Sequence, residues 1–265
     1  MAYRPVNAIE VLCWGRRVGA LALDPARGYY AFEYYPEFKR TGIELAPLML
    51  PLETTDIAIF PNLPERTFHR LPPFIADSLP DDFGNSLINA WIARNSIDHG
   101  SFTPLDRLAY VAGRGMGALQ YRPAIRIGRR SKTTAVELDE IVSAARKAVA
   151  VNLRYARPDE VDAELAQLIE VGTSAGGARA KAVVGWDAGS ETFVSGQFAV
   201  PEGFEHWIIK FDTADSADYD SSGQYGRIEY AYYLMALASG VSISASRLLC
   251  ADCPLCFEQF VTIVS

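Results

Sequence analysis

A glycine-rich segment followed at once by an apolar run constrains this chain more than any other feature of its sequence. Residues 172–181 read Gly-Thr-Ser-Ala-Gly-Gly-Ala-Arg-Ala-Lys, and residues 182–186, Ala-Val-Val-Gly-Trp, are typical of a β-strand. Small residues let successive backbone N–H groups surround an anion, and a strand that follows fixes one end of such a loop. The spacing matches neither the dinucleotide-binding fingerprint nor the P-loop. We interpret the segment as a phosphate-binding loop, with a helix stop at Gly172 and a flexible turn as the alternative.

Two segments further along the chain support phosphate chemistry. Residues 205–211, Glu-His-Trp-Ile-Ile-Lys-Phe, have the pattern of an apolar strand that carries one lysine, Lys210. A lysine among buried residues loses solvation unless an anion meets its ammonium group, and ATP phosphates would serve. Residues 228–238 are typical of an apolar helix that ends near Gly240, with Glu229 in its first turn. Loop, strand lysine and helix glutamate follow the order of a protein kinase N-lobe.

In these segments the sequence resembles the HipA-type toxins, serine/threonine kinases of bacterial toxin–antitoxin systems. The resemblance covers residues 7–249 and rests on five segments in the family's order: residues 77–84 (Asp-Ser-Leu-Pro-Asp-Asp-Phe-Gly), 113–123 (Gly-Arg-Gly-Met-Gly-Ala-Leu-Gln-Tyr-Arg-Pro), 172–181, 207–211, and 229–231 with 237–238. Ala180 departs from the pattern, since many members have proline before the loop lysine.

The resemblance implies a role for each residue of the candidate site. Lys210 would contact the α- and β-phosphates of ATP and would be steadied by Glu229. Lys181 is grouped with the cofactor-binding residues, although a structural role is the alternative. Ser174 matches the family's loop serine, whose autophosphorylation would add about −1.5 to −2 charges where ATP phosphates belong and so expel the loop. The backbone N–H groups that would hold the phosphates belong to Ala175, Gly176, Gly177 and Ala178.

The resemblance also implies ATP and Mg as cofactors, but we expect weak or absent binding in this chain. Kinase turnover needs a catalytic aspartate and Mg-binding residues, which in this family lie in an Asp-Gly-His-x-x-Asn motif. None of His69, His99 and His206 follows an Asp-Gly pair, so we predict no catalytic and no metal-binding residue, and no phosphoryl transfer by the chain alone. Family members continue into a large helical C-lobe, whereas this sequence ends at Ser265. A truncated gene, a frameshifted end and the first half of a split kinase all stay open.

The pattern along the chain predicts an α+β protein: a HipA-like N-terminal subdomain, with a small sheet and helices, followed by a kinase-like N-lobe without its C-lobe. We place the subdomain at residues 1–123, a basic linker at 124–133, the N-lobe-like part at 134–249 and an atypical cysteine-rich tail at 250–265. Apolar runs at residues 9–14 and 18–23 predict a hairpin, and the aromatic run 29–35 predicts a third strand.

Helix signals are clearest at three places. The acidic residues Asp77, Asp81 and Asp82 indicate caps for a helix that includes residues 87–92, rather than a metal site. A capping box at residues 134–137 predicts a helix that starts at Thr134, and Pro158 opens a second helix that ends at Gly172. The glycines at 113, 115 and 117 predict a tight turn before a strand.

Composition limits the classes of partner. Net charge is −7, with 25 Lys and Arg against 32 Asp and Glu, which gives no reason to expect direct nucleic-acid or membrane binding. The absence of a charged leader and of an apolar run near 18 residues predicts a cytoplasmic chain. Cys250, Cys253 and Cys256 cluster in the tail; a soft metal there would need a fourth ligand, and a tail foreign to the fold is the reading we favour.

The resemblance implies a HipB-like DNA-binding antitoxin as partner, with a separate C-lobe chain as a further candidate. In the intact family it implies a protein substrate in the translation machinery, which these residues do not identify. Two other classes stay open. In the first, the chain is a non-catalytic binding module, which would co-purify with a small DNA-binding protein. In the second, it is a decayed relic that aggregates because its apolar face is open to water.

Overall fold

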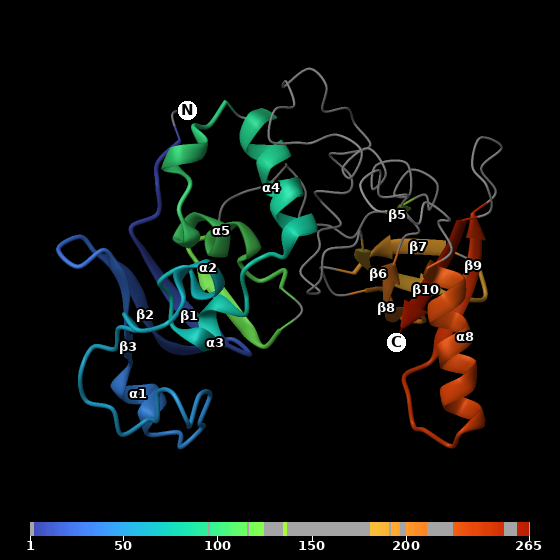
Figure 1. Ribbon diagram of the computed structural model, residues 1–265, viewed down its shortest axis with the longest axis horizontal. Helices are drawn as coiled ribbons and strands as arrows, with labels where there is room; N and C mark the ends of the chain where they lie inside the picture. Colours follow the sequence, from blue (N-terminus) through green and yellow to red (C-terminus); the bar gives the residue numbers. More distant parts are fainter. Residues whose placement is uncertain are drawn as a thin grey trace. The chain divides into compact units, whose positions relative to one another are not determined.

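The chain forms two compact units, residues 1–80 with 97–127 and residues 81–96 with 128–265. The computed structural model describes residues 3–94, 96–115, 117–124, 135–136, 181–190, 192–196, 200–210, 225–251 and 259–264. Each unit is built on its own antiparallel sheet (Figure 1). The molecule is therefore a mixed α+β protein with two small sheets. The α+β class predicted from the sequence is confirmed.

The first unit has a four-stranded sheet in the order β3-β2-β1-β4. Its strands are β1 (Ala8–Cys13), β2 (Arg16–Asp24), β3 (Tyr29–Tyr34) and β4 (Leu119–Arg122). The predicted hairpin and third strand are confirmed, with Trp14 and Gly15 in the turn at φ of 47° and 77°. The strand predicted after the glycine cluster is confirmed as β4, which pairs with β1.

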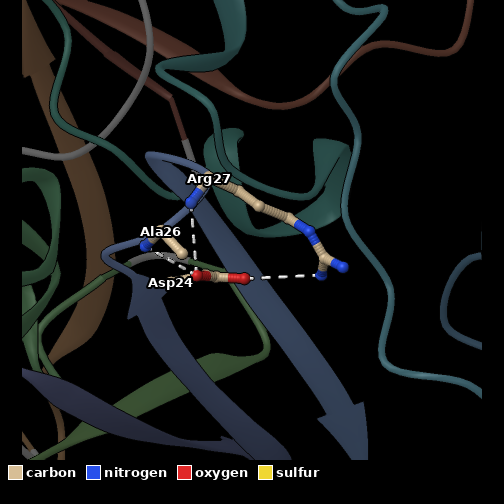
Figure 2. A network of polar contacts seen from close by, with 3 residues as sticks. All are labelled: Asp24, Ala26 and Arg27. Carbon is tan, nitrogen blue, oxygen red and sulfur yellow. Dashed lines mark hydrogen bonds and ion pairs between the residues drawn. The ribbon is translucent and has the colours of Figure 1, made fainter.

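Asp24 closes the turn between β2 and β3. Its Oδ1 accepts hydrogen bonds from the backbone N–H groups of Ala26 at 2.9 Å and Arg27 at 3.3 Å, and its Oδ2 pairs with the Arg27 guanidinium at 3.4 Å (Figure 2). Gly28 follows with φ of 70°, and its N–H donates to the Asp24 carbonyl at 2.8 Å. A short carboxylate that bonds to its own following backbone is a common way to fix a turn, and here it fixes the register of the two strands.

Short helices complete this first unit. They are α1 (Pro36–Lys39), α2 (Glu65–Phe68), α3 (Pro73–Ala76), the 3₁₀ turn η1 (His99–Ser101) and α5 (Pro104–Val111). α5 packs against β1 and β4, and α1 packs against β2 (Figure 1). Alternate residues of the strands point to one side, so Val11, Leu21 and Phe32 join Ile75 and Leu108 in one buried cluster.

The second unit has a six-stranded sheet in the order β5-β7-β6-β8-β10-β9. Its strands are β5 (Ala135–Val136), β6 (Lys181–Asp187), β7 (Thr192–Ser195), β8 (Glu205–Lys210), β9 (Ser246–Ala251) and β10 (Gln259–Val264). The helices described in this unit are α4 (Asp82–Arg94) and α8 (Tyr225–Ala238). α8 packs against β9 and β10 (Figure 1). The helix predicted around residues 87–92 is confirmed as α4, and it begins earlier, at Asp82.

One face of this second sheet is an aromatic core. Trp186 on β6 meets Trp207 on β8 edge to face, with ring centroids 5.3 Å apart, and stacks on Phe193 of β7 at 5.9 Å. The guanidinium of Arg247 on β9 lies over the Trp186 ring at 4.9 Å. Because side chains alternate along a strand, Lys210 and Lys181 belong to the opposite face.

The structure corrects the helix predicted from Thr134. Residues 135–136 form the edge strand β5, with Ala135 opposite Val194 and Val136 opposite Phe193. A local capping pattern is a weak preference, and pairing with a sheet edge outweighs it where β-branched residues are present. The remainder of that predicted helix, the helix predicted from Pro158 and most of the linker at 124–133 lie outside the described residues.

The structure also corrects the reading of the tail as foreign to the fold. Residues 259–264 form β10, which lies between β8 and β9 and pairs with both. Its residues Gln-Phe-Val-Thr-Ile-Val are rich in β-branched side chains, which favour a pleated and partly buried position. Cys253 and Cys256 lie outside the described residues.

Candidate functional site

Lys210 and Glu229 form an ion pair in the second unit. Lys210 is the last residue of β8, and its Nζ lies 2.8 Å from Oε2 of Glu229 on α8. The two side chains are 42% and 38% exposed. An ion pair this open to water contributes little to stability, so a multivalent anion can approach the ammonium group without a large penalty. The sequence places these two residues in one site, and the structure brings them together.

Lys181 lies directly opposite Lys210 in the sheet. The two residues are partners in the antiparallel ladder between β6 and β8, so their side chains leave the same face of the sheet. Two positive charges at such positions repel each other and destabilise the pairing unless each is compensated. Lys181 is also the last residue of the glycine-rich segment 172–181. The end of that segment is therefore one strand spacing, about 4.8 Å, from the strand that carries Lys210.

Asp81 compensates Lys181. The Lys181 Nζ donates to Oδ2 of Asp81 at 2.8 Å, and the two side chains are only 7% and 8% exposed. The other carboxylate oxygen, Oδ1, accepts from the backbone N–H of Gly84 in the first turn of α4 at 2.7 Å. Asp81 thus caps α4, as the sequence predicts, and in addition holds a lysine 100 residues away.

The remaining predicted site residues fall outside the described part of the chain. Ser174 and the four backbone donors Ala175, Gly176, Gly177 and Ala178 precede Lys181, where the description of β6 begins. Their roles stay predictions.

Sequence reasoning missed two contributions to this region. The interpretation of Asp81 as a helix cap was correct but incomplete, because a local pattern carries no sign of a partner so far along the chain. The second is Thr262 of β10, which lies opposite Lys210 on the side away from Lys181. The β-branched run in residues 261–264 is the signal that could have indicated a strand there.

The charged groups beside Lys210 decide which ligands could bind there. Within the ranges that the structure describes, no group of three or more His, Cys, Asp or Glu side chains could hold a metal ion. A partly exposed ammonium group beside the end of a glycine-rich segment suits an anion with several oxygens. Among the described residues, no helix has the length and hydropathy needed to cross a membrane.

Two domain families match this chain. Residues 9–122 match the HipA N-terminal domain, and residues 173–262 match the HipA-like C-terminal domain. The chain belongs to the HipA family. The second HipA match begins inside the glycine-rich segment and runs into β10, so both lysine strands and α8 lie within it.

A solved structure shows the same HipA fold. It is described as the toxin–antitoxin system of Shewanella oneidensis MR-1 with HipA, HipB and operator DNA, and it matches with a TM-score of 0.55 and 14% sequence identity. The alignment covers 97% of this chain and 50% of the matched chain, so this chain spans about half the length of that protein. At this identity the likeness concerns the fold. A comparison with curated proteins gave no match.

Proposed function

We propose that this chain is a HipA-type toxin component of a toxin–antitoxin system, and that its second unit binds the phosphates of ATP at Lys210. The observation that carries the proposal is the partly exposed Lys210–Glu229 ion pair, beside the end of the glycine-rich segment. In protein kinases a strand lysine paired with a helix glutamate has this place relative to the phosphate loop.

Each residue of the site then has a distinct task. Lys210 contacts the α- and β-phosphates through its ammonium group, and Glu229 limits the directions in which that group points. The backbone N–H groups of residues 175–178 donate to phosphate oxygens, and Ser174 is the residue whose phosphorylation would block the site. Bound Mg-ATP supplies the phosphoryl group and the cation that neutralises it.

The proposed site binds Mg-ATP but does not by itself provide phosphoryl transfer. The 265 residues hold no Asp-Gly-His-x-x-Asn motif, so they offer no aspartate of that kind to orient a substrate hydroxyl. We therefore expect the chain alone to bind Mg-ATP weakly and to transfer no phosphate, either to itself at Ser174 or to another protein. Radiolabel on Ser174 of the purified chain would contradict this.

Calorimetric titration with Mg-ATP tests the binding site. Wild type is expected to bind weakly, and Lys210→Ala to lose that binding. The matched control is Arg66→Ala, which removes one exposed cation from the first unit and should leave the affinity unchanged. Equal affinity in wild type and Lys210→Ala would reject Lys210 as the phosphate ligand.

The second candidate function is a non-catalytic binding module that contacts a HipB-like antitoxin. The matched HipA chain was solved with HipB and operator DNA, and a net charge of −7 favours DNA contact through a partner rather than directly. Affinity purification of the tagged chain from its own cells tests this. Recovery of a small helix-turn-helix protein with wild type, and equal recovery of that protein with Lys210→Ala, would favour the binding module.

One observation favours the hypothesis that this chain is half of a split kinase, whose other half would be a separate C-lobe chain. α8 exposes five large apolar or aromatic side chains: Ile228, Tyr232, Leu234, Met235 and Leu237. Recovery of a second chain that carries the Asp-Gly-His-x-x-Asn motif, and phosphoryl transfer by the two chains together, would support it. A target in the translation machinery would then be sought with that complex.

A further inference from the structure

The buried ion pair between Asp81 and Lys181 lies next to the candidate site, and nucleotide binding does not require it directly. Both side chains are more than nine-tenths buried, whereas the neighbouring Lys210–Glu229 pair is more than a third exposed. A buried charge without a well-placed partner is strongly destabilising, so the loss of either member of this pair should lower the stability of the unit.

The Asp81 carboxylate is held from two sides. Oδ1 accepts from the Gly84 N–H at 2.7 Å, and Oδ2 accepts from Lys181 at 2.8 Å. The first contact belongs to the N-terminus of α4, where backbone N–H groups and the helix dipole favour a negative charge. The second fixes the first residue of β6. Asp81 therefore ties the start of a helix to the residue at which the glycine-rich segment ends.

This arrangement separates the two lysines that face each other across β6 and β8. The ammonium of Lys181 is buried against a carboxylate, and a phosphate that used it would have to leave Asp81 as an uncompensated buried charge. Lys210 carries no such restriction, because its partner Glu229 is itself open to water. The two residues are equivalent in the sheet register but not in what an anion can reach.

On the basis of the proposed function, we propose that Asp81 is a positioning residue for nucleotide binding. It holds Lys181 as a buried anchor at the end of the glycine-rich segment, so that Lys181 is not a phosphate ligand and the phosphates meet Lys210. Of the two roles that the sequence left open for Lys181, this selects the structural one.

A double-mutant cycle on the purified full chain tests the proposal. Asp81→Asn keeps an oxygen that can cap α4, since asparagine caps as well as aspartate, but removes the charge that Lys181 needs. Lys181→Met removes the other charge, and the double variant removes both. Asp77→Asn is the matched control, because Asp77 is exposed and lies in the first unit.

Two quantities are measured for each variant: the thermal midpoint, and the Mg-ATP dissociation constant at a temperature at which all variants are folded. Each single variant should lower the midpoint, and the double variant should recover most of the loss. Asp81→Asn should weaken Mg-ATP binding by roughly ten- to a hundredfold through misplacement of the segment end. The double variant should return to within a few-fold of wild type, and Asp77→Asn should match wild type in both quantities.

Three results would overturn the proposal. Additive midpoint losses in the double variant would mean that the two residues are not coupled. A double variant that binds as weakly as Lys181→Met, with its midpoint restored, would make Lys181 a direct phosphate ligand. Wild-type binding in Asp81→Asn would remove the positioning role.

Failure of the proposed function is distinguishable from failure of this inference. If Lys210→Ala binds Mg-ATP as wild type does, or wild type does not bind, the nucleotide site at Lys210 is rejected and the positioning role falls with it. The midpoint cycle would still report whether Asp81 and Lys181 form a coupled structural pair.

Discussion

Lys181 and Lys210 face each other across two neighbouring antiparallel strands, and each donates to a different carboxylate. The side chain of Lys181 is 7% exposed and that of Lys210 is 42% exposed. Repulsion between the two charges is relieved by Asp81 on one side and Glu229 on the other. The sheet thereby presents one accessible ammonium group and keeps the second as part of its core.

Glu229→Gln is expected to weaken Mg-ATP binding with little change in the free energy of unfolding. The Lys210–Glu229 pair is partly exposed, so its loss should lower the free energy of unfolding by no more than about 1 kcal/mol. Mg-ATP affinity should fall several-fold, less than in Lys210→Ala, because Lys210 stays present but is free to point elsewhere. Urea unfolding and calorimetry give the two values.

The control for that variant is Glu202→Gln, an exposed glutamate of the same unit, which should change neither value. Tighter Mg-ATP binding in Glu229→Gln would show instead that Glu229 competes with phosphate for the lysine.

The first unit should lose stability at alkaline pH. Burial raises the pKa of Tyr34 and of Tyr110 to about 12 each, against about 10 for an exposed tyrosine. The folded state therefore favours the neutral phenols. Their contribution is fully present below about pH 10 and is lost as the pH rises from about 10 to 12. Denaturant unfolding at a series of pH values, followed by circular dichroism, measures the loss.

Tyr34→Phe tests the assignment of that alkaline loss. The Tyr34 hydroxyl donates to the Leu50 carbonyl at 3.1 Å, so the variant should be less stable by about 1 kcal/mol near neutral pH. It should then lose less free energy of unfolding than wild type between about pH 10 and 12. An unchanged alkaline loss would mean that Tyr34 does not contribute to it.

Gly19 should not tolerate a methyl group. A Cβ atom there would lie 2.2 Å from the Glu33 carbonyl oxygen and 2.7 Å from Cζ of Phe32. Gly19→Ala should therefore lower the free energy of unfolding by about 1–3 kcal/mol or more, because the nearest atom belongs to the backbone of β3. Gly117→Ala is the control: a Cβ there meets nothing within 4 Å, so the change should stay within about 0.5 kcal/mol. Equal urea midpoints for the two variants would contradict the packing of β2 against β3.

The exposed apolar residues of α8 should govern solubility rather than folding. Tyr232 and Met235 are 67% and 61% exposed and lie three positions apart on the helix. Replacing both with glutamine should change the free energy of unfolding by no more than about 0.5 kcal/mol per site and reduce self-association, measured by light scattering. Ile209→Gln, at a fully buried position of β8, should instead destabilise the unit. Loss of cooperative unfolding in the α8 variant would show that these side chains are needed for the fold.

The elements that the sequence predicts well are those decided by local patterns. Alternating apolar residues and the Trp14-Gly15 turn lie close together in the sequence, and the hairpin they predict is present. The Lys210–Glu229 pair was predictable because the order of strand and helix is itself a kinase pattern. The helix predicted at residues 135–136 is wrong because their partners, Phe193 and Val194, are far along the chain. Pairing with these residues imposes a strand on a helix-capping pattern.

The Asp81–Lys181 pair and the place of β10 could not be predicted for the same physical reason. A helix cap explains Asp81 completely at the local level, and only the fold, which brings its carboxylate to the first residue of β6, reveals the second partner. In the same way, the cysteine spacing in residues 250–256 indicated a metal site or a tail foreign to the fold, and not a strand. The pairing of β10 with β8 and β9 depends on the sheet that is already in place.

In the proposed site Lys210, and not Lys181, meets the phosphates of a bound nucleotide. Labelling with an acyl-phosphate derivative of ATP tests it most directly, because a lysine beside the phosphates attacks the acyl carbonyl, forms an amide and releases ATP. Mass spectrometry of the peptides then identifies the labelled lysine. We expect label on Lys210 that excess Mg-ATP suppresses, and none on Lys181. Suppressible label on Lys181, or none on Lys210, would rule out Lys210 as the lysine that meets the phosphates.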